Sequence, residues 1–324
     1  MAKARAILKR RKAVRNIRKI TKTMQMIATA KFQKSLRRVL ATKPYTLKVC
    51  ELVTDLSRRV RNLEHPMLRK VDGTNATNRV AVLVFTSDRG LAGAYNGLVI
   101  RQAVKTIREL EQAGKQVQLF VAGKKGHSYF SYQRRPFTKF EGFGDIPRFA
   151  DAERVALRAI EAFVNGEIDA VHVVYMNFIS TGVQRPDTMT LLPLPELMPT
   201  VRNLAQQLAE KEAQLKAGAL DMKRRGDDVK AADIEVPLNL EYDFMPDARS
   251  LMDELLPLTV KTAFFQAVLD AKTSEHVARM VAMKAATDNA TKMAKALTME
   301  YNRARQSQIT TELAEIMGGA EAMK

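Results

Sequence analysis

The stretch MVAMKAATDNATKMAKALTMEYNRARQSQ, residues 280–308, decides the fold of this chain. Its small and apolar residues follow a heptad pattern, in which steps of three and four residues alternate without a break. On an α-helix this spacing places the side chains on one stripe that faces a partner helix along its whole length. The residues of this stripe are Met280, Met283, Thr287, Ala290, Ala294, Leu297, Tyr301, Ala304 and Gln308.

The helix that carries the stripe is predicted to be long. No proline or glycine interrupts the chain from Leu258 to Met317. At about 1.5 Å per residue, such a helix could extend for about 90 Å. A helix of this length cannot lie inside a compact domain of a chain this size. It is expected to project, and it needs a second helix to wind around.

The beginning of the chain offers that second helix. No proline or glycine occurs before Pro44, and Ile17, Ile20, Met24 and Ile27 repeat the three-four-three spacing. Bulky residues on one helix and small residues on the other allow close packing in a two-stranded coil. The sequence therefore predicts that the two ends of the chain pair in an antiparallel coiled coil, with these four residues in its seam. The alternative is two unrelated amphipathic helices.

The positive charge of the chain is concentrated at its start. Residues 1–70 contain 21 Lys and Arg against Glu51, Asp55 and Glu64, an excess that equals the net charge of +18 for the whole chain. A mitochondrial transit peptide would also be rich in serine, yet the first serine is Ser35. The remaining interpretations are a nucleic-acid-binding arm, a helix that faces an acidic protein surface, or a solvated face with no specific partner.

From Arg79 the sequence alternates between strand and helix patterns. The continuous apolar run from Val80 to Phe85 is typical of a strand buried on both faces. Alternation of this kind predicts a small three-layer, Rossmann-like α/β unit with a mostly parallel sheet. The expected elements are strands at 80–85, 117–121, 170–179 and 188–192, and helices at 97–112 and 150–164, with Gly114 and Gly166 as helix ends.

No motif of catalysis or cofactor binding is found. Gly90, Gly93 and Gly97 follow the first strand, but their spacing matches neither the dinucleotide fingerprint nor the phosphate loop, so a structural turn is favoured. The four histidines show no spacing of metal ligands, and Cys50 is the only cysteine. No apolar run is long enough to cross a membrane. We expect no catalytic, cofactor-binding or metal-binding residues.

The sequence divides into four regions. Residues 1–60 form the N-terminal coiled-coil helix, 75–200 the α/β domain, 201–246 a charged insertion and linker, and 247–324 the C-terminal coiled-coil helix. Within the third region, a short helix is expected at 203–216 and a strand at 238–244. A short helix at 250–256 is expected to end before Pro257, which would introduce the long helix.

Several stretches resemble the γ subunit of the rotary (F-type) ATP synthases. The C-terminal stretches Ser274–Asn289 and Tyr301–Ala320 are similar to the last helix of that family, and Ile309-Thr310-x-Glu312-Leu313-x-Glu315-Ile316-x-x-Gly319-Ala320 fits its signature. Ile17–Lys31 looks like its first helix, and Ser87–Asn96 looks like its first strand-loop. The resemblance covers both ends and most of the middle of the chain, in order.

The chain departs from the family pattern in two places. It has Leu91-Ala92-Gly93 where the family usually has Leu-Cys-Gly, so any role of that thiol is absent. Residues 201–236 look like an insertion relative to typical bacterial members. Chloroplast relatives carry a redox-active cysteine pair in a similar region, but this insertion contains no cysteine. Thiol switching is therefore excluded, and the role of the insertion stays open.

The resemblance implies a rotor. In the family, the coil turns inside a ring of three α and three β subunits, while the α/β domain contacts the ε subunit and the membrane-embedded c-ring. Transmembrane proton flow turns the coil, which switches the nucleotide sites of β and also regulates ATPase activity. The catalytic residues belong to β, so this chain would be a non-catalytic subunit. It would need no cofactor and no nucleic acid, and would lie peripherally on the cytoplasmic face of the bacterial inner membrane, held through the c-ring.

The resemblance also implies which residues contact β. Lys22 and Met24 match the region that faces the acidic lever segment of β, and Arg305 and Gln306 match the polar pair that meets a β loop. Thr310 and Glu312 are further candidates. The basic first helix would attract the lever through ion pairs of about 0.2–1 kcal/mol each. A basic coiled-coil protein that binds nucleic acid, and an α/β enzyme, remain as alternatives.

Overall fold

A computed structural model of the chain describes residues 2–59, 65–69, 76–140, 143–194 and 248–322. The chain forms two compact units. The coil unit consists of Met1–Gln33, Leu91–Ala94 and Glu275–Lys324, and the sheet unit of Lys34–Gly90 and Tyr95–Ser274. The predicted helix at 203–216, the strand at 238–244 and the insertion at 201–236 lie outside the described residues.

The sheet unit contains a five-stranded mixed sheet in the order β3-β2-β1-β4-β5. Neighbouring strands are parallel except for β4 and β5, which are antiparallel. The central strand, β1, is buried because it lies between β2 and β4 and is covered on both faces. This explains its continuous apolar sequence. The strands are β1 (Arg79–Phe85), β2 (Gln116–Ala122), β3 (Thr138–Lys139), β4 (Ala170–Phe178) and β5 (Gln184–Leu192).

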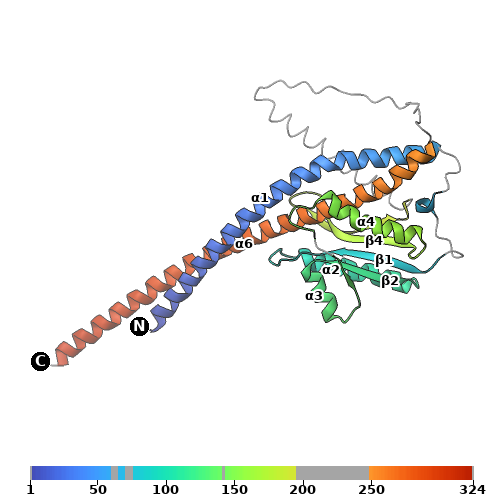
Figure 1. The fold of residues 1–324 in the computed structure, drawn as a ribbon. Helices are drawn as coiled ribbons and strands as arrows, with labels where there is room; N and C mark the ends of the chain where they lie inside the picture. Colours follow the sequence, from blue (N-terminus) through green and yellow to red (C-terminus); the bar gives the residue numbers. More distant parts are fainter. Residues whose placement is uncertain (1, 60–64, 70–75, 141–142, 195–247, 323–324) are drawn as a thin grey trace, which may run out of the picture. The chain divides into compact units, whose positions relative to one another are not determined.

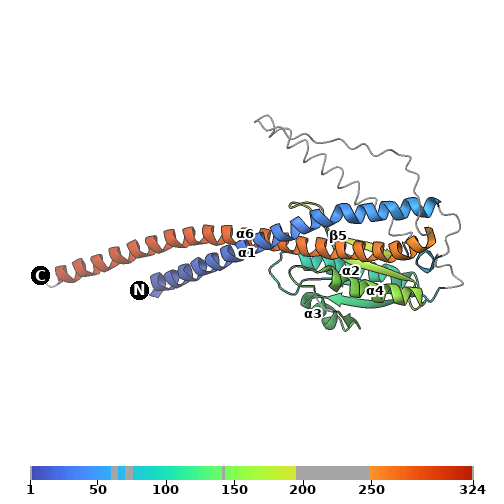
Figure 2. The ribbon, with the colours of Figure 1, turned by 45° about the horizontal axis from the view of Figure 1, so that its top comes forward.

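Helices cover both faces of the sheet, as the views in Figures 1 and 2 show. One face contacts α2 (Tyr95–Gln112) and α3 (Lys124–Tyr132). The other face packs on α4 (Phe149–Val164) and on the first part of α6, whose Val260, Phe264 and Val268 are fully buried in the main core. The predicted three-layer α/β unit with a mostly parallel sheet is therefore confirmed.

Two very long helices, α1 (Ala2–Arg59) and α6 (Ala248–Ala322), take part in both units. They are antiparallel: in the sheet unit the hydroxyl of Thr42 donates to Gln266 over 3.0 Å, and in the coil unit the hydroxyl of Thr287 donates to Thr21 over 2.9 Å. The two helices run side by side through the coil unit in both views (Figures 1 and 2). The predicted coiled coil of the two chain ends is confirmed.

Proline does not start α6, contrary to the prediction. The helix begins at Ala248 and contains Pro257, as α1 contains Pro44. A proline inside a helix removes one backbone hydrogen bond and costs about 3 kcal/mol. Met252 and Leu256 before Pro257, and Val260 after it, are all fully buried. Their burial offsets the missing hydrogen bond, which is why the helix continues through the proline.

Three elements of the sheet unit were absent from the prediction. The structure adds α3, the short strand β3 and a 3-10 turn, η1 (Pro66–Leu68), and it begins β5 four residues before the predicted strand. The added part of β5 contains Pro186, which only an edge strand accepts, because proline has no N–H to donate. β5 is the edge of the sheet next to β4.

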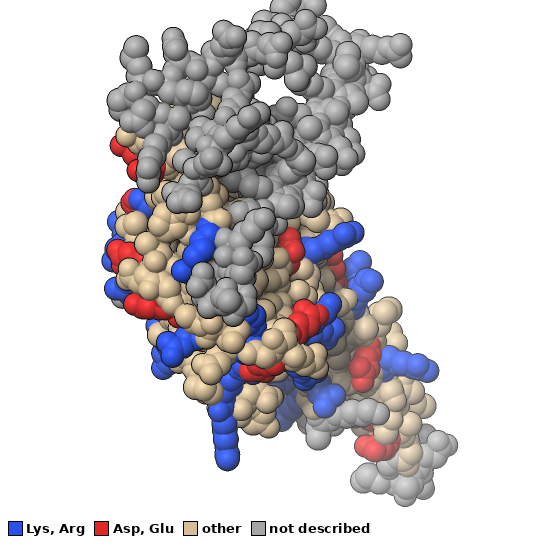
Figure 3. All heavy atoms as spheres, turned by 90° about the vertical axis from the view of Figure 1, so that its right-hand side faces the viewer, with Lys and Arg blue, Asp and Glu red and all other residues tan. Residues whose placement is uncertain are grey.

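The surface of the sheet unit is mixed in charge. Figure 3 shows Lys and Arg side chains interspersed with Asp and Glu side chains among neutral residues. This pattern agrees with the sequence, in which residues 71–324 carry 32 Lys and Arg against 32 Asp and Glu. On the described part of this face, Lys and Arg do not form the continuous basic patch that non-specific nucleic-acid binding requires.

One histidine makes the stability of the sheet unit dependent on pH. Burial lowers the pKa of His172 from 6.5 to about 4, and its Nδ1 lies 3.1 Å from the Thr190 hydroxyl. The unfolded chain therefore binds more protons between pH 6.5 and about 4. We expect the unfolding free energy to be unaffected by His172 above pH 6.5 and to fall by about 3 kcal/mol as pH drops to 4.

The measurement is a series of urea titrations from pH 7.5 to 4 on the full chain and on His172→Gln. Carboxylates titrate in both proteins, so the difference between them isolates the histidine. The unfolding free energy of the variant should depend less steeply on pH between 6.5 and 4. Parallel pH profiles for the two proteins would contradict this assignment.

Candidate functional site

The seam of the coil unit follows the predicted stripe on α6. All nine residues from Met280 to Gln308 at heptad positions are buried or half-buried, whereas most of their neighbours are exposed. Met283 and Ala290 are the most buried of them, at 5% and 8% exposed. Near its end, the guanidinium of Arg11 lies over the ring of Tyr301, 4.9 Å from the ring centroid. A contact of this kind stabilises by about 0.5–1 kcal/mol at an exposed site.

The seam of α1 differs from the prediction. Ile17, Ile20, Met24 and Ile27 are 52%, 59%, 36% and 51% exposed, so they do not form the seam. The seam residues of α1 instead follow a second heptad set, one position away from the predicted one. The side chains of this set that are buried or half-buried are Ile7, Arg11, Val14, Thr21, Gln25, Ala28 and Phe32.

The size of the seam residues explains this difference. Thr21 and Ala28 are small, as are Thr287 and Ala290 on α6, so the two helix backbones can approach closely along this stretch. The bulky isoleucines would hold the helices apart. Two sets of residues with heptad spacing lie next to each other on α1. A choice between them based on side-chain size alone selects the set that is exposed.

Close packing of this kind makes a testable prediction about the seam. Ala290→Leu should overpack the seam and lower the free energy of unfolding of the coil by about 1–3 kcal/mol. The matched control is Ala285→Leu, the same change at an exposed position of the same helix. Circular dichroism of the full chain during thermal unfolding measures both. Equal melting curves for the two variants would contradict the assigned seam.

The register of the coil leaves an apolar surface uncovered. On α1 it comprises the four residues that the prediction assigned to the seam. On α6 every described residue from Ile309 to Gly318 is exposed. Exposed apolar groups of this extent mark contact surfaces for other proteins. The large exposed apolar residues at the end of α6 are Ile309, Leu313, Ile316 and Met317.

The residues implied to contact β all lie off the seam and are exposed: Lys22, Met24, Arg305, Gln306, Thr310 and Glu312. The hydroxyl of Thr310 donates to the backbone oxygen of Gln306, and the carboxylate of Glu312 accepts from Gln308. Arg305 has no side-chain partner within the described residues. These side chains are thus available to a partner, although their role in contacting one stays a prediction.

The structure does not bring the candidate residues into one cluster. Thr21 contacts Thr287, and Arg11 contacts Tyr301, so Lys22 and Met24 lie level with the region near Thr287. Arg305 lies 18 residues further along α6, which corresponds to about 27 Å. The candidates therefore form two separate surfaces, one at mid-coil and one near its end.

The glycine loop is a structural turn. The backbone N–H and the hydroxyl of Ser87 contact the side-chain oxygen of Asn96 over 2.9 and 3.1 Å. Asp88 accepts from the backbone N–H of Lys124 over 3.1 Å. Leu91 and Gly93 both have positive φ, which closes the loop. Ser87 and Asp88 are thus engaged with Asn96 and with the start of α3.

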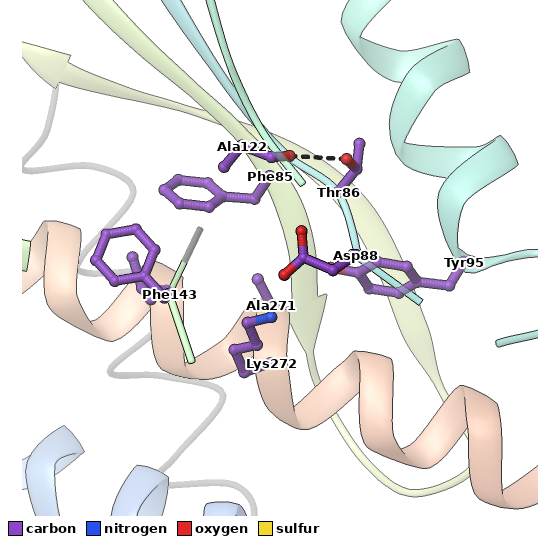
Figure 4. Close-up of a pocket in the computed structure, with 9 residues that line it drawn as sticks. Phe85, Thr86, Asp88, Tyr95, Ala122, Phe143, Ala271 and Lys272 are labelled. Atoms are coloured by element: carbon purple, nitrogen blue, oxygen red, sulfur yellow. Dashed lines mark hydrogen bonds between the residues drawn. The ribbon is translucent and has the colours of Figure 1, made fainter. Parts of the chain in front are cut away.

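The position at which doubly wound sheets bind ligands is filled. Ligands in such folds bind beyond the carboxyl ends of the strands. Here α6 supplies Ala271 and Lys272 to that place, and Figure 4 shows them facing Phe85, Asp88 and Tyr95. The cavity that remains has a volume of about 10 Å³, enough for about one water molecule. Small-molecule sites usually have about 300–1,000 Å³.

Neither a metal centre nor a membrane span is found in the part of the chain that the structure describes. No group of three or more His, Cys, Asp and Glu side chains that could hold a metal ion occurs among the described residues. None of the helices described is long and apolar enough to cross a membrane.

Comparisons with known proteins agree on one family. A family model described as ATP synthase matches residues 3–323. The chain is 39% identical to the ATP synthase gamma chain of Rhodopirellula baltica and 36% identical to that of Leptospira biflexa, in both cases over all of both chains.

Solved structures show the same fold. One chain of the Euglena gracilis mitochondrial ATP synthase, solved with OSCP, F1 and the c-ring, matches with a TM-score of 0.59 and 17% identity, over 99% of this chain and 95% of that one. A chain of the central stalk and c-ring of the Tetrahymena thermophila mitochondrial ATP synthase matches with a TM-score of 0.52 and 18% identity, over 82% and 99%.

Proposed function

This chain belongs to the ATP synthase gamma-chain family, and on that premise we propose that it is the central-stalk rotor of an F-type ATP synthase. Its coil turns inside a ring of α and β subunits and couples transmembrane proton flow to ATP synthesis, while the sheet unit contacts the ε subunit and the c-ring. The chain itself is non-catalytic, and it acts peripherally at the cytoplasmic face of the membrane.

One observation carries the proposal: the working surface of the coil lies off its seam. A rotor must contact the alternative states of its partner unequally as it turns. Binding shifts the equilibrium between two conformations of a partner only when the affinities for the two differ. The exposed apolar residues of α1 and the uncovered end of α6 provide such faces. The seam itself is occupied by the pairing of α1 with α6 and cannot serve a partner.

The positive charge of α1 supports the proposed contact with the β subunit. The exposed Lys22 lies beside Met24 on a helix that has no acidic residue before Glu51. Exposed ion pairs stabilise by about 0.2–1 kcal/mol each, so contacts with an acidic partner form and separate readily as the coil turns. Nucleic-acid binding, the alternative interpretation of this charge, finds no support in the comparisons.

Co-expression of the full chain with the α and β subunits encoded in the same genome tests the proposal. We expect a complex that contains all three chains and hydrolyses ATP. A salt series of gel shifts with duplex DNA, run on the same preparation of the full chain, tests the alternative. Failure of the chain to purify with α and β, together with tight and salt-dependent DNA binding, would overturn the proposed function.

A further inference from the structure

The outer side of α2 carries a groove that the proposed rotor contacts on the coil do not use. Its volume is about 520 Å³, and it is lined by residues of α2 and by Tyr129 of α3. Both helices are labelled in Figure 1. Ile100 and Val104 of α2 and Tyr129 of α3, all half-buried, form an apolar floor. The groove therefore offers apolar contact area at the surface of the sheet unit.

A row of cations borders this floor. Arg101, Lys105 and Arg108 are exposed and follow each other at four and three residues, so they lie on one side of α2. Glu109 is the acidic residue of the groove, and it lies 3.8 Å from Lys105. Within the described part of the chain, neither Arg101 nor Arg108 has an acidic partner. The groove thus carries two uncompensated positive charges.

The length of the groove matches a helical segment. Its lining residues extend along α2 from Gly97 to Gln112, which is about 22 Å at the helical rise. An added Cβ at Gly97 would meet nothing within 4 Å, so this end of the floor is open. An apolar floor beside a basic edge, over four helical turns, is complementary to an amphipathic helix with acidic residues.

We propose that the groove between α2 and α3 binds an acidic amphipathic helix of another subunit of the assembly. The inference rests on the proposed function, because that function names the complex in which the partner subunit is found. A helix is favoured over a small anion because a phosphate or carboxylate alone would use the cations and leave the apolar floor in water. Each desolvated apolar side chain adds to the affinity, and the cations select the charge of the partner.

Carbodiimide cross-linking of the purified complex tests the inference. This reagent joins an amine to a carboxylate only where the two are in contact. We expect Lys105 to be joined to an Asp or Glu of another subunit, within a segment of helical apolar periodicity. The link from Lys105 to Glu109 within the chain serves as the internal standard. Detection of that internal link alone would overturn the inference.

Variants of the groove, assembled in the same complex, distinguish its two components. Arg101→Glu with Arg108→Glu reverses the charge, and Gly97→Leu fills the open end of the floor without changing charge. Each should lower the yield of the intersubunit link from Lys105 by about tenfold relative to the internal link. Arg154→Glu with Arg158→Glu is the control, since it makes the same charge change at two exposed positions of α4. Yields unaffected by Gly97→Leu and by charge reversal would contradict the inference.

Sedimentation of the full chain with phosphatidylglycerol vesicles tests an anionic membrane surface as the partner. Binding that Arg101→Glu with Arg108→Glu abolishes, combined with no intersubunit link, would overturn the inference in favour of lipid. If α and β purify with the chain but Lys105 forms no intersubunit link, the groove inference fails and the rotor function stands. If α and β do not purify with the chain, the proposed function fails first.

Discussion

Gly123→Ala should unfold the sheet unit or lower its free energy of unfolding by more than about 3 kcal/mol. Gly123 follows β2 with φ +91°, a backbone conformation that other residues rarely adopt. An added Cβ would lie 2.2 Å from the backbone oxygen of Thr86 and 2.7 Å from its hydroxyl oxygen. Both distances are far shorter than any real Cβ contact, so the backbone would have to move.

The surrounding hydrogen bonds prevent that movement. The Thr86 hydroxyl donates to the backbone oxygen of Ala122 over 2.7 Å and accepts from the N–H of Gly126 over 2.9 Å. The N–H of Thr86 donates to the same Ala122 oxygen over 2.9 Å. Displacement of Thr86 would break the hydrogen bonds that join β1, β2 and α3. For this reason the expected effect exceeds that of an ordinary glycine substitution.

Gly114→Ala is the matched control. It has φ +77°, but an added Cβ there meets nothing within 4 Å. The control therefore has the backbone strain without the clash, and we expect its free energy of unfolding to fall by about 1–2 kcal/mol. Urea titrations of the full chain, followed by circular dichroism, measure both. Equal effects for the two variants would show that the close approach to Thr86 is not what requires glycine at position 123.

Arg305→Ala combined with Gln306→Ala should lower the rate of ATP synthesis of the assembled complex by about tenfold, while the fold is unchanged. Both side chains are exposed and lie off the seam, so their removal leaves the packing of α6 on α1 intact. A hydrogen bond from one of these side chains to a partner subunit contributes about 0.5–1.5 kcal/mol, and removal of two such bonds corresponds to about one order of magnitude in rate.

Glu300→Ala combined with Ser307→Ala is the control. It also removes one charged and one polar side chain, both exposed, within two helical turns of Arg305 and Gln306. Because positions 300 and 307 lie seven residues apart, they share one side of α6, turned away from the side of Arg305 and Gln306, and we expect a smaller decrease in the rate of synthesis. Circular dichroism checks that both double variants stay folded. Wild-type synthesis in the Arg305 and Gln306 variant would remove these residues from the working surface.

The sequence predicted the α6 stripe because an unbroken heptad set of small and apolar residues runs through Met280. It failed on α1, where the set that contains Ile17 and the set that contains Thr21 have the same spacing. Periodicity cannot decide between two such sets. The deciding quantity is how closely the backbones approach, and this depends on Thr287 and Ala290 of the other helix.

A weak local pattern explains why α3 of the sheet unit was not predicted. The α3 sequence, KKGHSYFSY, contains an internal glycine and few strong helix formers, so its propensity is weak. It forms a helix because Phe130 is buried and because its N-terminal turn is tied to Ser87 and Thr86. The groove beside α2 depends on this helix, and for that reason sequence reasoning could not have found it.

The claim that the chain is a rotor is tested most directly by observing rotation. A single cysteine at the exposed position 132, introduced as Tyr132→Cys in a Cys50→Ser background, would carry a bead on the sheet unit of a complex whose α and β subunits are fixed to a surface. Under ATP, the account predicts stepwise rotation of the bead in one direction. A bead that stays stationary while the same complex hydrolyses ATP at its normal rate would contradict it.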